Sequence, residues 1–214
     1  SKLVSYIINN NKIEKLPDGC ATLFDSNLFY KPYDYENQPT DFNLPSPYLS
    51  GILDQFISDK NMIPLFESNR GCPYGCTYCA WGVSSLSKIR KRPLEIVLAE
   101  LEYVANKSVG QVSWIFADAN FGIFERDVEI AKKIRSIKDS KGFPITTVIW
   151  HSKNTSDRNI EISKILNDEE GYIAIQSTDS NALKKAGRGK IQFKHLEKQI
   201  KHFSGLQKIL RKLI

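Results

Sequence analysis

The sequence has 214 residues, of which 41% are hydrophobic and 25% are charged. This composition excludes wholesale disorder and collagen-like repeats, and the length allows one domain or a domain with an appendage. No apolar run approaches the ~20 residues that span a bilayer, no leader pattern opens the sequence, and the net charge of +6 is spread along the chain. Because Met62 is the only methionine and residue 1 is a serine, we expect a processed chain or a fragment.

Residues 1–61 have little hydrophobic periodicity, and turn-forming residues recur every few positions. The prolines of this stretch are Pro17, Pro32, Pro39, Pro45 and Pro47. We therefore predict an irregular linker or cap over residues 1–61, the remnant of an upstream domain, and a separate core over residues 62–214. Cys20 stands alone in the linker, and we expect it to be a small buried hydrophobic residue.

Strands and helices alternate through the predicted core. Apolar residues recur at three-and-four spacing after Pro93, and β-branched residues fill 145–150. The predicted elements are a strand at 62–67, a helix from Pro93, a strand at 112–117, a helix through Ile130 that ends near Gly142, a strand at 145–150, a helix at 159–167, a strand at 172–175 and a helix at 193–203.

This alternation is typical of parallel βαβ units, so the predicted fold class is α/β. Right-handed crossovers place the carboxyl ends of all parallel strands at one edge of the sheet. The loops at 72–79, 118–122, 151–154 and 176–180 each follow a predicted strand. We expect these four loops to meet on one rim, and that is where chemistry is expected in such folds.

Three of the four cysteines lie within eight residues, at Cys72, Cys76 and Cys79. Thiols this close together cannot join distant segments as disulfides, and their spacing indicates a shared metal ligand set. A structural zinc site needs a fourth ligand, and the histidines, at positions 151, 195 and 202, form no close pair. Three thiolates without a fourth ligand favour a cubane iron–sulfur cluster with one open iron.

Cys72-x-x-x-Cys76-x-x-Cys79, with Tyr78 before the last cysteine, lies between a predicted strand and a predicted helix. In this setting the motif resembles the radical S-adenosylmethionine superfamily. The match is closest to its cobalamin-binding-type branch, and it extends over about residues 40–195. The segments that carry it are Pro45–Gly51, Glu67–Cys76, Trp81-Gly82, Asp118–Gly122, Arg126-Asp127, Lys153-Asn154 and Gln176-Ser177.

The resemblance implies a partial (β/α) barrel of about four βα units that binds a 4Fe–4S cluster and S-adenosylmethionine. The three cysteines would hold the cluster, and the open iron would chelate the cofactor. One electron would then cleave a carbon–sulfur bond to give a 5′-deoxyadenosyl radical, which abstracts hydrogen from a substrate. Radical methylation of an unactivated carbon is the commonest outcome in this branch. No residue is assigned as catalytic in its own right.

The resemblance also implies cofactor contacts. Tyr78 would approach the adenine, and Asp118 and Asn120 occupy the place of the segment that takes the methionine ammonium, although the common Gly-Gly-Glu form is absent. Gln176 and Ser177 stand where ribose or carboxylate contacts arise, and Arg188 would pair with a carboxylate. For each residue a structural alternative stays open: Asp118 as a turn former, Gln176 and Ser177 as a loop before a helix, and Arg188 as a solvated turn charge. We expect His151 to be structural.

Two departures limit what the resemblance implies. The family core has six βα units and this sequence ends after four, with an atypical last segment at 206–214. No cobalamin-binding signature occurs in residues 1–61, so cobalamin could enter only through a domain that this sequence does not contain.

Several partners and alternatives follow. The expected partners are a small-molecule or peptide substrate and an external electron donor such as flavodoxin or ferredoxin, with no membrane and no nucleic acid. We expect a cytoplasmic location, because an exposed cluster and free thiols need a reducing compartment. The alternatives are a zinc-stabilised binding module without enzymatic activity and an inactive fragment that still binds a cluster.

Overall fold

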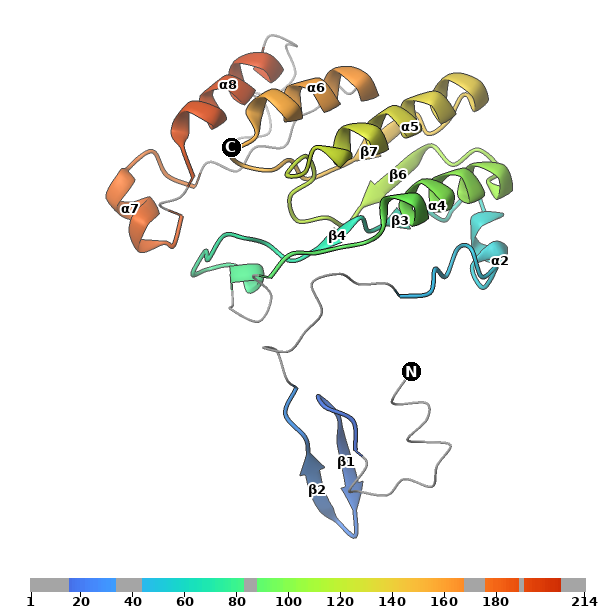
Figure 1. The fold of residues 1–214 in the computed structure, drawn as a ribbon, viewed down its shortest axis with the longest axis vertical. Helices are drawn as coiled ribbons and strands as arrows, with labels where there is room; N and C mark the ends of the chain where they lie inside the picture. The colour runs from blue at the N-terminus through green and yellow to red at the C-terminus, as the bar shows by residue number, and fades with distance from the viewer. Residues whose placement is uncertain (1–15, 34–43, 83–87, 168–175, 189–190, 205–214) are drawn as a thin grey trace. The chain divides into compact units, whose positions relative to one another are not determined.

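The computed structural model describes residues 16–33, 44–82, 88–167, 176–188 and 191–204. The chain divides into two compact units, Ser1–Pro39 and Thr40–Ile214, and each is described by itself (Figure 1). The larger unit begins well before residue 62, where the composition of the sequence changes. Whether residues 1–61 form a remnant of an upstream domain stays a prediction.

The first unit contains a β-hairpin. Strands β1 (Ala21–Phe24) and β2 (Asn27–Tyr30) pair in antiparallel fashion. The two residues between them, Asp25 and Ser26, have φ values of 46° and 64°, the left-handed conformation that tight two-residue hairpin turns require. The expectation of an irregular segment is therefore wrong for residues 21–30. All four β2 residues are exposed, so the sequence lacks the buried–exposed alternation that identifies a strand.

The second unit is built on a parallel sheet of three strands in the order β3-β6-β7. The strands are β3 (Leu65–Phe66), β6 (Ser113–Phe116) and β7 (Thr146–Val148). Helices α4 (Leu94–Lys107), α5 (Arg126–Lys141) and α6 (Ser156–Leu166) follow the three strands in turn and lie in a row over one face of the sheet (Figure 1). The predicted α/β class and the first three strand–helix units are confirmed.

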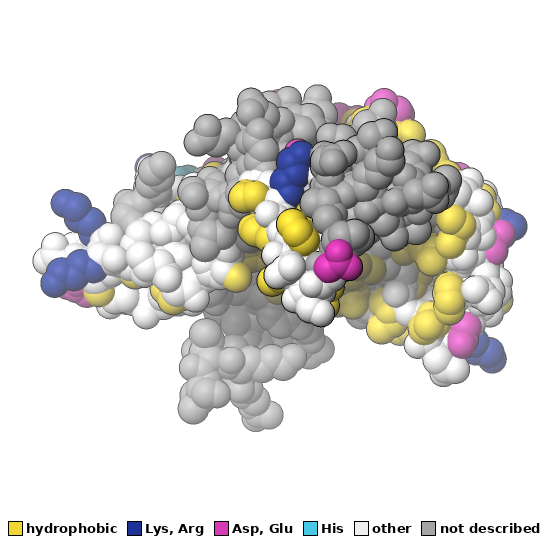
Figure 2. Space-filling model, turned by 90° about the horizontal axis from the view of Figure 1, so that it is seen from below, with side chains coloured by type: hydrophobic (Ala, Val, Ile, Leu, Met, Phe, Trp, Pro, Cys, Tyr) yellow, Lys and Arg dark blue, Asp and Glu magenta, His cyan; other side chains and the backbone are white. Residues whose placement is uncertain are grey.

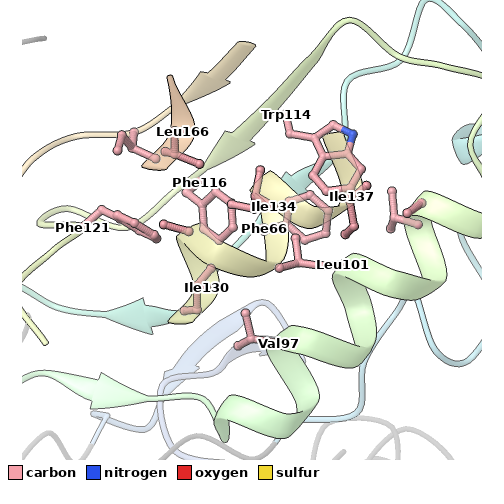
Figure 3. Close-up of a cluster of buried hydrophobic side chains, with 14 of the residues drawn as sticks. Phe66, Val97, Leu101, Trp114, Phe116, Phe121, Ile130, Ile134, Ile137 and Leu166 are labelled. Atoms are coloured by element: carbon pink, nitrogen blue, oxygen red, sulfur yellow. The ribbon is translucent and has the colours of Figure 1, made fainter. Parts of the chain in front are cut away.

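The core lies between this sheet and its helices. Phe66 stacks on Phe116 and contacts Trp114, and all three side chains are buried. Figure 3 shows them facing the apolar side of α5, which contributes Ile130 and Ile134. Full burial of a large apolar side chain contributes roughly 1.5–3 kcal/mol, so this cluster fixes the positions of the strands whose ends carry the site.

Short elements flank the loop that contains the three cysteines. Strands β4 (Asn69–Arg70) and β5 (Arg90–Lys91) pair in antiparallel fashion on either side of it, and η2 (Ala80–Gly82) is a single 3₁₀ turn directly after Cys79. Before the sheet, the short helix α2 (Asp54–Ile57) packs against α4. Strands β4 and β5 have only two residues each and show no periodicity, and the sequence did not predict them.

The chain continues with α7 (Ser180–Lys185) and α8 (Phe193–Ser204), and α8 packs on α6. The fourth predicted strand, at 172–175, and the atypical segment at 206–214 lie outside the described residues. Within the described ranges, none of the helices has the length and apolar character needed to cross a membrane.

Candidate metal centre

The three clustered cysteines lie in the loop between β4 and η2, and all three are free thiols. Cys72 and Cys76 are 8% and 9% exposed, and Cys79 is half-buried. They pack with a small apolar cluster of residues from three loops and α8. Its members are Tyr74, Trp81, Ala119, Ile191 and Leu196. The thiols are therefore held in surroundings that admit little water. Cys20 in the first unit is half-buried, as Cys79 is, so the expectation that Cys20 is buried is wrong.

Two glycines hold the cysteine loop by close backbone contact. A Cβ on Gly82 would lie 2.1 Å from the carbonyl oxygen of Cys76, and a Cβ on Gly187 would lie 2.0 Å from that of Gly75. Gly187 also has φ +69°. Close by, the amide of Thr77 donates to the carbonyl of Ala186 at 3.1 Å. The segment after α7 therefore packs directly on the cysteine loop.

Asn120 connects the loop after β6 with the first cysteine. Its Nδ2 donates to Sγ of Cys72 at 3.2 Å, and its Oδ1 accepts from Nζ of Lys153 at 2.9 Å. Asn120 is buried. Burial lowers the pKa of Lys153, while the nearby cysteines, Cys72 foremost, act in the opposite direction. Lys153 is therefore linked to Cys72 through the side chain of Asn120. The sequence had marked it only as part of the family resemblance.

Asp118 has no exposed surface. Its Oδ1 accepts from the backbone amides of Ser68 and Asn69 at 2.8 and 3.1 Å, and its Oδ2 accepts from Nδ2 of Asn69 at 3.1 Å and from the Ser68 hydroxyl. Burial raises the pKa of Asp118 to about 7, with the hydrogen bonds from Ser68 and Asn69 acting against that rise. Asp118 thus joins the end of β6 to the segment that leads into the cysteine loop.

Arg188 contacts two other residues, Tyr78 and Gln176, that the sequence had also assigned to cofactor binding. Its Nη1 donates to the Tyr78 hydroxyl and to Oε1 of Gln176, and Arg188 itself is only 4% exposed. Tyr78 is 54% exposed beside it. The alternative of a solvated turn charge at Arg188 is therefore wrong.

Ser177 has a different role, because its Oγ accepts from the amide of Asp179 at 3.0 Å. Asp179 in turn caps α7 through the amide of Ala182. The alternative reading of a loop before a helix therefore describes Ser177 well in this conformation, while Gln176 belongs with Arg188.

His151 takes part in the core rather than in the rim. It pairs with Phe121 in an isolated parallel bridge, and its ring lies 5.6 Å from that of Phe203 in α8. Burial lowers the pKa of His151 to about 4, so the imidazole is neutral at physiological pH. The structural role expected from the sequence agrees with this position.

The cysteine loop fits an iron–sulfur cluster by the chemistry of its donors. Three free thiols are the ligands that such a cluster needs, and an amide donor to Cys72 and an apolar enclosure are surroundings that tune it. Among the described residues, however, no three Cys, His, Asp or Glu side chains already surround one point as metal ligands do. In a 4Fe–4S cluster each cysteine binds a different iron, so the three sulfur atoms need not meet at one point.

Comparison with known proteins extends these observations. Residues 66–208 match the family model of the Radical SAM superfamily. The chain is 34% identical over 172 residues to the 2-(S-pantetheinyl)-carbapenam-3-carboxylate methyltransferase of Streptantibioticus cattleyicolor, covering 76% of this chain and 25% of that protein. It is 35% identical over 162 residues to the cobalamin-dependent radical SAM methyltransferase TokK of Streptomyces tokunonensis, covering 72% of this chain and 24% of that protein.

A solved structure of the cobalamin-dependent S-adenosylmethionine radical enzyme OxsB shares the fold, with a TM-score of 0.57 at 18% identity. The match covers 96% of this chain and 30% of OxsB. This chain thus spans about a quarter of the length of the two methyltransferases.

Three free thiols near the carboxyl edge of a parallel α/β sheet are the donor set of a candidate thiolate metal site. The family match over residues 66–208 shows that the chain belongs to the radical S-adenosylmethionine superfamily. Members of this superfamily use a 4Fe–4S cluster and S-adenosylmethionine. One of these relatives, TokK, is a cobalamin-dependent radical SAM methyltransferase, which agrees with the branch that the sequence resembles.

Proposed function

We propose that this chain binds a 4Fe–4S cluster through Cys72, Cys76 and Cys79 and takes part in the reductive cleavage of S-adenosylmethionine. The observation that carries the proposal is the buried, disulfide-free cysteine loop on the rim of the parallel sheet, within reach of Asn120 and Lys153. When bound, the cluster would pass one electron from an external donor to S-adenosylmethionine, which would cleave into methionine and a 5′-deoxyadenosyl radical.

The residues of the chain would position the cofactor and keep water away. Arg188 contacts both Tyr78 and Gln176, so a carboxylate that Arg188 binds would lie beside the cysteine loop. We assign Tyr78 to the adenine and Gln176 to the ribose or the carboxylate. Ser177 could contact the cofactor only if its Oγ gave up the hydrogen bond that it accepts from the amide of Asp179.

Asp118 and Asn120 divide between two tasks in this proposal. Asp118 is committed to Ser68 and Asn69, so we assign it to holding the loop in place rather than to the cofactor. Asn120 contacts Cys72 directly, so we assign it a place beside the proposed cluster.

We further propose that the reaction served is a radical methyl transfer that uses cobalamin, because both similar methyltransferases transfer methyl groups and TokK depends on cobalamin. Cobalamin would have to be held by residues outside this chain. The substrate is a small molecule or a peptide, and carbapenam carboxylates are the first class to assay, since one relative acts on such a compound. An external one-electron donor, flavodoxin or ferredoxin, and a cytoplasmic location complete the proposal.

The zinc-stabilised binding module finds less support. A zinc site of this type needs four protein ligands around one ion, and among the described residues no three Cys, His, Asp or Glu side chains gather around one point. A nucleic-acid module would also need a basic stripe. On the face in Figure 2, Lys and Arg side chains stand at separate points among apolar, acidic and uncharged surface.

The test is anaerobic reconstitution with iron and sulfide, followed by EPR of the dithionite-reduced protein with and without S-adenosylmethionine. A 4Fe–4S signal that changes when the cofactor is added supports the proposal, and Cys76→Ala should abolish it. Cys20→Ala is the matched control, because it removes a free thiol outside the loop and should leave the signal intact. A cluster signal that ignores the cofactor would indicate an inactive cluster-binding fragment, and stoichiometric zinc without a cluster would overturn the proposal.

A further inference from the structure

The orientation of the Asn120 amide is fixed by its partners. The ammonium of Lys153 has three donors and no acceptor, so it can face only the oxygen of the amide. The contact of 2.9 Å between Lys153 Nζ and Asn120 Oδ1 meets this requirement. With the oxygen held by Lys153, the N–H₂ group of Asn120 must face the other way, and there it meets Sγ of Cys72 at 3.2 Å.

The backbone around Asn120 and Lys153 forms one frame. The amide of Phe121 donates to the carbonyl of Trp150 at 2.8 Å, and the amide of Ser152 donates to the carbonyl of Phe121 at 2.8 Å. Each of the two side chains is therefore adjacent in sequence to a residue of this paired backbone. Because Asn120 is buried, water does not compete for its N–H₂ group, and a hydrogen bond in such surroundings is stronger than one in water.

We propose that Asn120, oriented by Lys153, is a positioning residue that sets the redox potential of the cluster through its N–H donor to Cys72. This inference rests on the proposed function, because it requires a cluster on Cys72. A hydrogen bond to a thiolate ligand stabilises the state with more negative charge on the cluster, which is the reduced state. The chain Lys153–Asn120–Cys72 therefore makes the cluster easier to reduce than the three thiolates alone would.

The effect is measured as the midpoint potential of the reconstituted cluster, by redox titration followed by EPR. Asn120→Leu removes the donor at similar volume, and Asn120→Asp replaces the N–H₂ group with an acceptor. In both variants we expect the ratio of reduced to oxidised cluster at a fixed potential to fall about tenfold, which is about 59 mV for a one-electron couple. Asn120→Asp should give the larger fall, because a carboxylate oxygen would face the thiolate sulfur.

Variants at Lys153 test whether it orients the amide. Lys153→Met removes both the charge and the restraint on the amide, so the potential should fall at least as far as in Asn120→Leu. Lys153→Arg keeps a charged donor and should restore most of the wild-type potential. Lys132→Met removes the same charge from an exposed position of α5 and should leave the potential unchanged.

The outcomes separate this inference from the proposed function. If the wild-type chain takes up no iron and sulfide in cluster proportions, the proposed function fails and the inference fails with it. If the wild-type and variant chains load equal clusters and both Asn120 variants keep the wild-type potential, the inference is overturned and the proposed function stands. If Asn120→Leu does not fold by circular dichroism, the near-isosteric Asn120→Asp decides the question.

Discussion

Replacing Gly82 with alanine should disturb the cysteine loop without imposing backbone strain of its own. Gly82 is not among the glycines with positive φ, so an alanine there meets no conformational penalty. The new Cβ would nevertheless lie 2.1 Å from the carbonyl oxygen of Cys76 and 2.9 Å from its backbone nitrogen. All of the expected effect therefore comes from pushing Cys76, a proposed cluster ligand, away from Gly82.

The size of the disturbance follows from the distances. To reach a Cβ contact of 3.0 Å from the present 2.1 Å, the two backbones must separate by about 0.9 Å. Overpacking of this kind destabilises a protein by about 1–3 kcal/mol. Because the displaced atoms belong to the loop itself, we expect Gly82→Ala to reduce the iron bound after reconstitution to well under half of the wild-type content.

The control is Gly142→Ala at the end of α5. Gly142 has φ +77°, but a Cβ there would meet no atom within 4 Å. Alanine should therefore cost about 1 kcal/mol through backbone strain alone, with the iron content unchanged. Iron analysis after reconstitution and urea unfolding of the apo chain measure the two quantities. A Gly82→Ala chain with the wild-type iron content and unfolding midpoint would refute the close packing of Gly82 on Cys76.

Two further predictions concern stability. Burial lowers the pKa of His151 from 6.5 to about 4, so between these pH values the unfolded chain binds a proton that the folded chain excludes. The free energy of unfolding should therefore fall as the pH falls through this window. His151→Gln should remove up to about 3 kcal/mol of that fall, measured by urea unfolding at two pH values. An unchanged pH dependence in the variant would contradict this prediction. Arg92→Met should cost about 3–5 kcal/mol, because it leaves the buried carboxylate of Glu100 without the guanidinium that contacts it at 2.8 Å. Arg135→Met, at an exposed pair, should cost under about 1 kcal/mol, and equal losses in the two variants would be inconsistent with this reasoning.

The sequence predicted those parts of the fold in which apolar periodicity or a β-branched run is long enough to indicate a helix or a strand. Helices α4 and α5 and strand β6 appear where they were expected, and α5 ends at Gly142 in the left-handed conformation. The hairpin at 21–30 and the pair β4–β5 were missed because their residues are exposed or too few to show a pattern. The cysteine spacing could point to the candidate site because it is local in the sequence.

Asp118 illustrates what spacing alone could not predict. Trp114 and Phe116 are both buried on the helix-covered side of β6, and Asp118 continues the same alternation by two. A carboxylate at that position points inward rather than to the rim, and it finds its donors in Ser68 and Asn69. The alternation is visible in the sequence. The inward position of Asp118 could not be predicted from it without knowing which side of the sheet the helices cover.

The site depends on contacts that no local pattern encodes. Gly187 reaches the cysteine loop from more than 100 positions further along the chain, as does Arg188 with its contact to Tyr78. Neither position belongs to a periodic segment whose place could be read from the sequence. Lys153 acquires its significance only because β6 and β7 are neighbours, which brings its ammonium to Asn120.

The register of β6 against β7 explains how Asn120 comes to face Cys72. Ile115 pairs with Val148, and pairing resumes where Phe121 bridges His151. The segment that follows β6 advances six residues between these two pairs, and the segment that follows β7 advances only three. Three extra residues after β6 must therefore leave the plane of the pairing. Asn120 belongs to this projecting turn, which is anchored by paired backbone at both ends. The strand register and the length of the turn therefore determine that Asn120 faces the thiol of Cys72. A deletion within the turn should abolish this contact even if every side chain of the site were kept.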